Sequence, residues 1–186
     1  YNYGDSMSSY ALENHPEYYG AYGSEEEDCI RVKARLVDDT FARLLDELEQ
    51  EGLLENTVIV ALSDHYPYGY TNTEQLLEYS CGTDLLCLDN TPCFIWSADI
   101  TPMTVNKTLN TSDLLPTLLN MLGIDAKYQY PGRDAFDPNY VGYAFFADGS
   151  WASEGVLCRK NIADDQSEVT VVWNKYGKYS AFKGWY

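Results

Sequence analysis

The apolar run 57–62 constrains this chain most, because it is rich in β-branched residues and stops abruptly. Such a run is typical of a strand that is buried on both faces of a parallel sheet. Pro67 and Gly69 then force the backbone out of the strand. We therefore expect Asp64 and His65 side by side at the carboxyl edge of a sheet, where open α/β sheets bind ligands.

Asp64 and His65 suggest a metal site by their chemistry. A carboxylate oxygen and a neutral imidazole nitrogen are both good ligands for Zn²⁺ or Mn²⁺. The same two residues also fit an ordinary turn in which the aspartate caps the backbone. The residue types alone leave both interpretations open.

Composition indicates a globular chain with a strong negative charge. It has 186 residues, of which 45% are hydrophobic, enough for one domain with a core. Twenty-nine acidic and twelve basic residues give a net charge of −17, which argues against binding nucleic acid. This charge suits an extracellular domain or one that gathers cations. No apolar run has the length of about 18 residues that a membrane-spanning helix needs.

The five cysteines are an odd number without C-x-x-C spacing; they are Cys29, Cys81, Cys87, Cys93 and Cys158. We expect Cys29 and Cys158 to be small buried residues, since both lie in apolar patterns. Cys81 and Cys87 flank a short loop, where they can pair in an oxidising compartment. A structural zinc site made by the three central cysteines and His65 is a weaker alternative, because the spacing is poor.

The opening segment, residues 1–26, lacks a helical or strand period and predicts irregular surface structure. Its histidine, His15, precedes a proline in a polar loop, where exposure to solvent is a more common outcome than a functional role. Ser24 and Glu27 form a capping-box pattern that opens a helix over residues 25–50. One apolar stripe of this helix should face a core, and Gly52 should end it.

Further along, the pattern predicts a helix over 72–79, a buried strand over 92–96, and a helix that starts at 111–113 and ends at Gly123. From residue 140 the sequence changes to short alternating runs typical of strands, with turn signals between them. These runs cover 141–146, 155–159, 169–173 and 179–182. We expect a small antiparallel sheet, with a hairpin at 174–179.

Several phrases resemble the sulfatase-like branch of the alkaline phosphatase superfamily. They are Gly52–Thr57 after the long helix, Ser63-Asp64-His65-Tyr66-Pro67-Tyr68-Gly69, the run 112–124 and Gly132-Arg133-Asp134. The second phrase is most similar to the lipoteichoic acid synthase (phosphoglycerol transferase) group. The resemblance covers residues 28–155.

The resemblance implies the fold class and the site. It implies an α/β fold, the C-terminal half of an alkaline-phosphatase-like α/β/α sandwich with a small antiparallel sheet at its C-terminus. Within this one domain we expect an irregular segment (1–26), an α/β core part (27–139) and the sheet (140–186). By resemblance, Asp64 and His65 are metal ligands, and Mn²⁺ is the first choice ahead of Mg²⁺, Zn²⁺ or Ca²⁺. Arg133 and Asp134 are expected to form a local ion pair that shapes a loop.

The resemblance also implies an activity for a longer parent protein. Relatives use a threonine nucleophile and a further acidic ligand, and neither can be matched here. We therefore expect an inactive part of a phosphoglycerol transferase, or of a sulfuric or phosphoric ester hydrolase. Its partners would be a phosphatidylglycerol-like lipid or polyglycerolphosphate chain, and the N-terminal half of the catalytic domain. Transmembrane helices outside this chain would anchor the parent on the extracellular face of a bacterial plasma membrane. A non-catalytic, acidic module that binds cell-wall glycan is the alternative.

Overall fold

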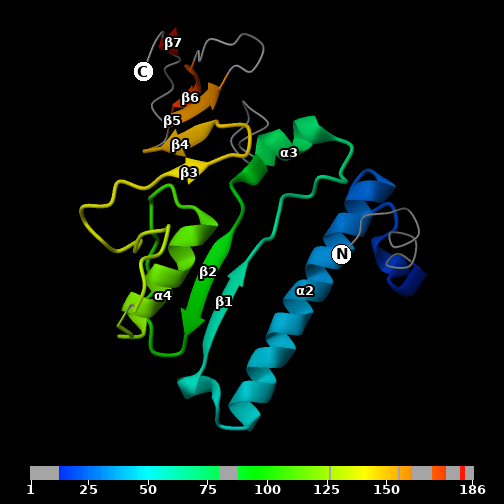
Figure 1. The fold of residues 1–186 in the computed structure, drawn as a ribbon. Coiled ribbons are helices and arrows are strands. Elements are labelled where there is room, and N and C mark those ends of the chain that lie inside the picture. Colours follow the sequence, from blue (N-terminus) through cyan, green and yellow to red (C-terminus); the bar gives the residue numbers. More distant parts are fainter. Residues whose placement is uncertain are drawn as a thin grey trace. The chain divides into compact units, whose positions relative to one another are not determined.

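The computed structural model describes residues 13–79, 88–125, 127–154, 156–160, 169–174 and 181–182. For residues 79 and 159–160 and for the last two ranges it describes the backbone alone. Helices and small antiparallel sheets make up an α/β fold (Figure 1). The chain forms two compact units, residues 1–101 and 102–186. Within the described residues, no helix combines the length and the apolar character that crossing a membrane requires.

The first unit is built from a long helix and a two-stranded sheet. Its elements are a 3-10 helix Pro16–Tyr18, helix α2 Glu25–Gln50, a 3-10 helix Leu54–Asn56, strand β1 Val58–Leu62, helix α3 Thr73–Tyr79 and strand β2 Cys93–Ser97. The predicted helices and the second predicted strand are thus confirmed to within about two residues.

Helix α2 begins and ends as its sequence predicts. The Ser24 hydroxyl accepts a hydrogen bond from the Glu27 N–H at 3.1 Å, which satisfies one of the free donors of the first turn. At the other end Gly52 has φ +68°. The Leu53 N–H bonds the Leu48 carbonyl and the Gly52 N–H bonds the Glu49 carbonyl, a Schellman motif. The chain therefore turns sharply from α2 toward β1.

Strand β1 pairs with β2 in antiparallel register, Val58 opposite Ser97 and Leu62 opposite Cys93 (Figure 1). The prediction of a parallel pairing with both faces covered is therefore wrong for the described residues. Val58 and Leu62 are exposed, and the three residues between them are half-buried. An apolar run predicts burial but carries no information about the direction of the neighbouring strand.

The apolar stripe of α2 is only partly covered. Cys29 and Val32 are fully buried beside Tyr18, and the ring of Phe41 lies 5.8 Å from that of Phe94 on β2. Val37 and Leu44 remain exposed. The core of this unit is therefore concentrated at the N-terminal end of α2.

The second unit contains a 3-10 helix Thr111–Asp113, helix α4 Leu114–Met121 and five short strands. The strands are β3 Ala144–Phe145, β4 Trp151–Ser153, β5 Val156–Lys160, β6 Val169–Asn174 and β7 Ala181–Phe182. They form one antiparallel sheet in sequence order, which confirms the predicted C-terminal sheet. Strand β4 was not predicted, and the turn of the predicted hairpin at 174–179 lies outside the described residues.

Candidate metal centre

Ser63 connects the end of β1 to the Asp64–His65 pair. Its N–H bonds the Pro92 carbonyl at 3.1 Å, which continues the β1–β2 pairing by one residue. Its hydroxyl donates to the His65 carbonyl at 2.6 Å. The backbone at His65 is thus tied to the end of the strand, so the strand positions the two candidate ligands.

The Asp64 and His65 side chains face each other. Asp64 Oδ1 accepts the His65 N–H at 3.0 Å, and Asp64 Oδ2 lies 3.4 Å from His65 Nε2. His65 Nδ1 lies 2.7 Å from the Tyr66 carbonyl oxygen. A carbonyl oxygen only accepts hydrogen bonds, so Nδ1 must carry the proton. In the neutral imidazole, Nε2 then carries the lone pair, and it lies 3.4 Å from the Asp64 carboxylate.

This arrangement fits a divalent cation. Two electron-pair donors this close together repel each other unless a proton or a cation lies between them. A tetrahedral cation with ligand distances of about 2.0–2.1 Å holds neighbouring donors about 3.3–3.4 Å apart, and Asp64 Oδ2 and His65 Nε2 are 3.4 Å apart. The side chains are 85% (Asp64) and 37% (His65) exposed, so an ion can reach them.

The pair does not make a complete site by itself. Catalytic zinc sites have three protein ligands as a rule. In the part of the chain that the structure describes, no group of three or more His, Cys, Asp or Glu side chains gathers to hold an ion. Asp64 and His65 therefore supply two donors, and their assignment as ligands stays a prediction.

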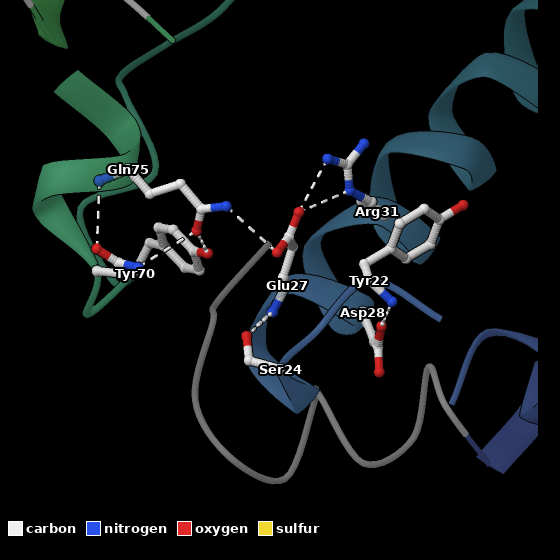
Figure 2. Close-up of polar contacts among 8 residues, drawn as sticks. Tyr22, Ser24, Glu27, Asp28, Arg31, Tyr70 and Gln75 are labelled. Atoms are coloured by element: carbon white, nitrogen blue, oxygen red, sulfur yellow. Dashed lines mark hydrogen bonds and ion pairs between the residues drawn. The ribbon is translucent and has the colours of Figure 1, made fainter. Parts of the chain in front are cut away.

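The N-terminal turn of α2 holds the segment that follows the pair. Glu26 Oε1 accepts the Thr71 N–H at 2.8 Å, and Glu26 Oε2 accepts the Thr71 hydroxyl at 2.6 Å. Figure 2 shows the neighbouring contacts, in which Glu27 accepts from Arg31 at 2.8 Å and from Gln75 at 3.3 Å. Gln75 in turn accepts the Tyr70 hydroxyl proton. The Ser24 half of the predicted capping box is thus present, whereas the Glu27 carboxylate contacts Arg31 and α3.

Asp28 ties the segment before α2 to the helix. It is 1% exposed, and its carboxylate accepts the Gly20 N–H at 2.6 Å. It also accepts the Tyr22 N–H at 2.8 Å (Figure 2). The Arg31 guanidinium lies 4.5 Å from the centroid of the Tyr22 ring, in a cation–π contact. Part of the segment predicted as irregular is therefore held by specific contacts.

His15 is not joined to the candidate site. Its Nδ1 lies 3.2 Å from Glu17 Oε1, and its ring lies edge-on to Tyr18. Over the described residues, no hydrogen bond or ion pair links His15 to Asp64 or His65. A backbone hydrogen bond, with a smaller contribution from His15, lowers the pKa of Glu17. The structure gives His15 a local role in the loop before α2.

In the second unit, Asp113 organises the loop that contains Gly132-Arg133-Asp134. Asp113 is 2% exposed and accepts the Arg133 N–H at 2.7 Å, the Asn110 N–H at 2.9 Å and the Tyr140 hydroxyl at 3.0 Å. Gly132 lies against the Ser112 backbone, where a Cβ would overlap the carbonyl. The sequence identified Asp113 only as part of a helix cap and missed these longer contacts.

The predicted ion pair between Arg133 and Asp134 is wrong. Among the described residues no ion pair joins them. Asp134 instead accepts the Asn120 side-chain amide at 2.8 Å and the Phe136 N–H at 3.0 Å. Adjacent residues of opposite charge point in different directions when the backbone turns, so proximity in sequence was a poor guide here.

The cysteines that the structure describes form no disulfide with one another. Cys29 and Cys158 are buried, as predicted, and Cys93 is exposed. Burial raises the pKa of the Cys158 thiol. Cys81 and Cys87 lie outside the described residues, so their proposed pairing and the alternative zinc site stay predictions.

Comparison with known proteins gives the family. The sequence profile described as "Sulfatase" matches residues 12–124. Lipoteichoic acid synthase 2 of Bacillus subtilis is 25% identical over 140 residues, 72% of this chain and 22% of that protein. The lipoteichoic acid synthase-like protein YvgJ of Bacillus subtilis is 27% identical over 147 residues, 74% of this chain and 24% of that protein.

Lipoteichoic acid synthase of Staphylococcus saprophyticus is 28% identical over 138 residues, 71% of this chain and 21% of that protein. The chain therefore spans less than a quarter of the length of these curated relatives. No solved structure matches it significantly. The profile covers more than half of the chain, including β1 and the Asp64–His65 pair. The resemblance noted in the sequence is thereby confirmed, and this chain belongs to the sulfatase family.

Proposed function

We propose that this chain is part of a metal-dependent phosphoglycerol transferase, or of a related enzyme that cleaves phosphate or sulfate esters. The observation that carries the proposal is the Asp64–His65 pair, whose facing Oδ2 and Nε2 atoms are 3.4 Å apart. The similarity to lipoteichoic acid synthases favours phosphoglycerol chemistry over sulfate chemistry. Carboxylate and imidazole together suit Mn²⁺ or Zn²⁺ better than Mg²⁺ or Ca²⁺.

In this proposal, Asp64 and His65 supply two of the ligands. The Asp64 carboxylate contributes negative charge, and His65 contributes Nε2 because its Nδ1 proton is held by the Tyr66 carbonyl. A divalent cation, when bound, polarises a phosphoryl or sulfuryl oxygen and favours the ionised form of a nucleophile. The remaining ligand and a threonine nucleophile would come from other parts of a longer protein.

The wider setting follows from the relatives and is also a proposal. The substrate would be a phosphatidylglycerol-like lipid or a polyglycerolphosphate chain. The catalytic domain would lie on the extracellular face of a bacterial plasma membrane, anchored by helices outside this chain. The partner closest to the site would be the N-terminal half of the catalytic domain.

Turnover assays test the proposal at two levels. The 186-residue chain should not hydrolyse p-nitrophenyl phosphate or a phosphatidylglycerol analogue in Mn²⁺, because it lacks the nucleophile. The full-length protein should be active, and His65→Ala or Asp64→Asn should remove that activity, while His15→Ala should not. Metal-dependent turnover by the chain alone, or full activity in His65→Ala, would overturn the proposal.

The second candidate is an acidic module that binds cell-wall glycan. Exposed aromatic side chains favour it, with Tyr68 at 63%, Phe145 at 70% and Tyr128 at 75% exposure. Under this candidate, removal of an exposed ring (Tyr128→Ala) should weaken glycan binding, and His65→Ala should change nothing.

A further inference from the structure

A tight turn directly after His65 supplies the contact that sets the proton position on its imidazole. The Tyr68 N–H donates to the Tyr66 carbonyl at 2.7 Å, two residues back, which defines a γ-turn with Pro67 at its centre. The fixed φ of proline, about −65°, suits the inverse form of this turn. The same Tyr66 carbonyl oxygen accepts a hydrogen bond from His65 Nδ1 at 2.7 Å. One carbonyl thus closes the turn and holds the imidazole.

Residues around the turn further restrict the position of the His65 imidazole. The Tyr70 N–H bonds the Pro67 carbonyl at 2.9 Å, so a second turn follows at once. The centroid of the Tyr68 ring lies 4.4 Å from that of the His65 ring, in a tilted contact. The imidazole is therefore held at Nδ1 and by the Tyr68 ring, and its Nε2 lies near Asp64.

We propose that the γ-turn Tyr66-Pro67-Tyr68 positions His65 as an Nδ1-protonated imidazole with Nε2 open to a cation. Pro67 is the positioning residue, since proline restricts the backbone of the preceding Tyr66 to extended conformations and its own φ suits the turn that the Tyr66 carbonyl closes. The part of this inference that concerns metal binding rests on the proposed function. Partners that orient a ligating histidine contribute about 10- to 100-fold to metal affinity.

Nitrogen NMR tests the turn without any metal. The chain has two histidines, so ring-¹⁵N labelling in a His15→Gln background leaves one imidazole to observe. At about pH 8.5, above the ordinary imidazole pKa, the proton should sit on Nδ1. Pro67→Gly should shift it toward the tautomer mixture of free histidine. Pro102→Gly, the same change in an exposed loop, should leave it on Nδ1.

Two results would overturn the inference. One is a proton on Nε2 in the parent chain, a measurement that needs no folded Pro67 variant. The other is an unchanged Nδ1 proton in a folded Pro67→Gly or, if that variant does not fold, in Pro67→Ala. Titration with Mn²⁺ distinguishes failure of the turn inference from failure of the proposed function. Weakening by about 10- to 100-fold in Pro67→Gly supports both, whereas an Nδ1 proton in the chain together with Mn²⁺ binding that is unchanged in His65→Ala supports the turn and refutes the metal site.

Discussion

Glu26 and Thr71 are joined by two hydrogen bonds, although they lie 45 residues apart in the sequence. One oxygen of the Glu26 carboxylate accepts the Thr71 N–H and the other accepts its hydroxyl. Thr71 comes shortly after the turn that holds His65. The first turn of α2 thus fixes the far end of the loop that carries the candidate ligands.

Removal of this carboxylate should loosen the loop. Glu26→Ala removes two hydrogen bonds to a charged acceptor and should lower the free energy of unfolding by about 1–3 kcal/mol. Glu25→Ala is the matched control, because it removes the neighbouring charge from the same helix terminus and should cost less than about 1 kcal/mol. Urea denaturation of both variants measures the difference. Equal stability of the two variants would refute the role given to Glu26.

Replacement of one carboxylate oxygen of Asp28 by an amide nitrogen should lower the stability of the fold. Asp28→Asn places an amide NH₂ where a carboxylate oxygen now accepts a backbone N–H, from Gly20 or from Tyr22. One donor is then left unsatisfied, and the cost should be about 1–3 kcal/mol. Asp46→Asn makes the same change at an exposed position of α2 and should stay within about 0.5 kcal/mol of the parent. Thermal unfolding compares them, and a stability loss in Asp46→Asn as large as that in Asp28→Asn would contradict this account.

Local signals in the sequence predicted much of the first unit. Ser24 and Gly52 mark the ends of α2, because a side-chain cap and a positive φ are satisfied by neighbouring residues alone. The position of Asp64 and His65 at the end of a strand was predicted for the same reason. Their proximity follows from adjacency in sequence and from the break in the strand.

Contacts between distant segments could not be predicted from the sequence. The antiparallel pairing of β1 with β2 depends on a partner more than thirty residues away, and an apolar run fits either direction. The roles of Glu26 and Asp113 depend on backbone donors that only the folded loop brings near. An acidic residue at the start of a helix can cap that helix or accept hydrogen bonds from a distant loop, and the sequence does not indicate which.

Tyr140 should make the second unit lose stability at high pH. Burial, followed by its hydrogen bond to Asp113, raises the pKa of Tyr140 above its ordinary value of 10.0. The folded state therefore keeps the phenolic proton more tightly than the unfolded state does. Its contribution is complete below pH 10 and is lost as pH rises through the folded-state pKa.

Tyr140→Phe removes this titration and serves as the comparison. Unfolding free energies measured from pH 9 to 11 should fall more steeply for the parent than for Tyr140→Phe. Tyr128→Phe, at an exposed tyrosine, should leave the slope of the parent unchanged. Identical slopes in the parent and Tyr140→Phe would show that the folded state does not favour the protonated phenol.

The described cysteines should differ in reactivity. Cys93 is exposed, whereas Cys29 and Cys158 are buried, and burial raises the pKa of Cys158, which lowers its thiolate fraction. A short treatment with iodoacetamide under native conditions should modify Cys93 and should leave the other two unmodified until denaturant is added. Peptide mass spectrometry identifies the modified positions, and rapid modification of Cys29 in the folded chain would contradict the burial described here.

Calorimetric titration of the chain with Mn²⁺ tests the central claim most directly. The parent and His15→Ala should give the same binding heat, because His15 is bonded to Glu17 and lies outside the proposed site. His65→Ala and Asp64→Asn should remove that heat while the fold, followed by circular dichroism, is retained. Binding that persists unchanged in a folded His65→Ala chain would contradict the claim that Asp64 and His65 bind a divalent cation.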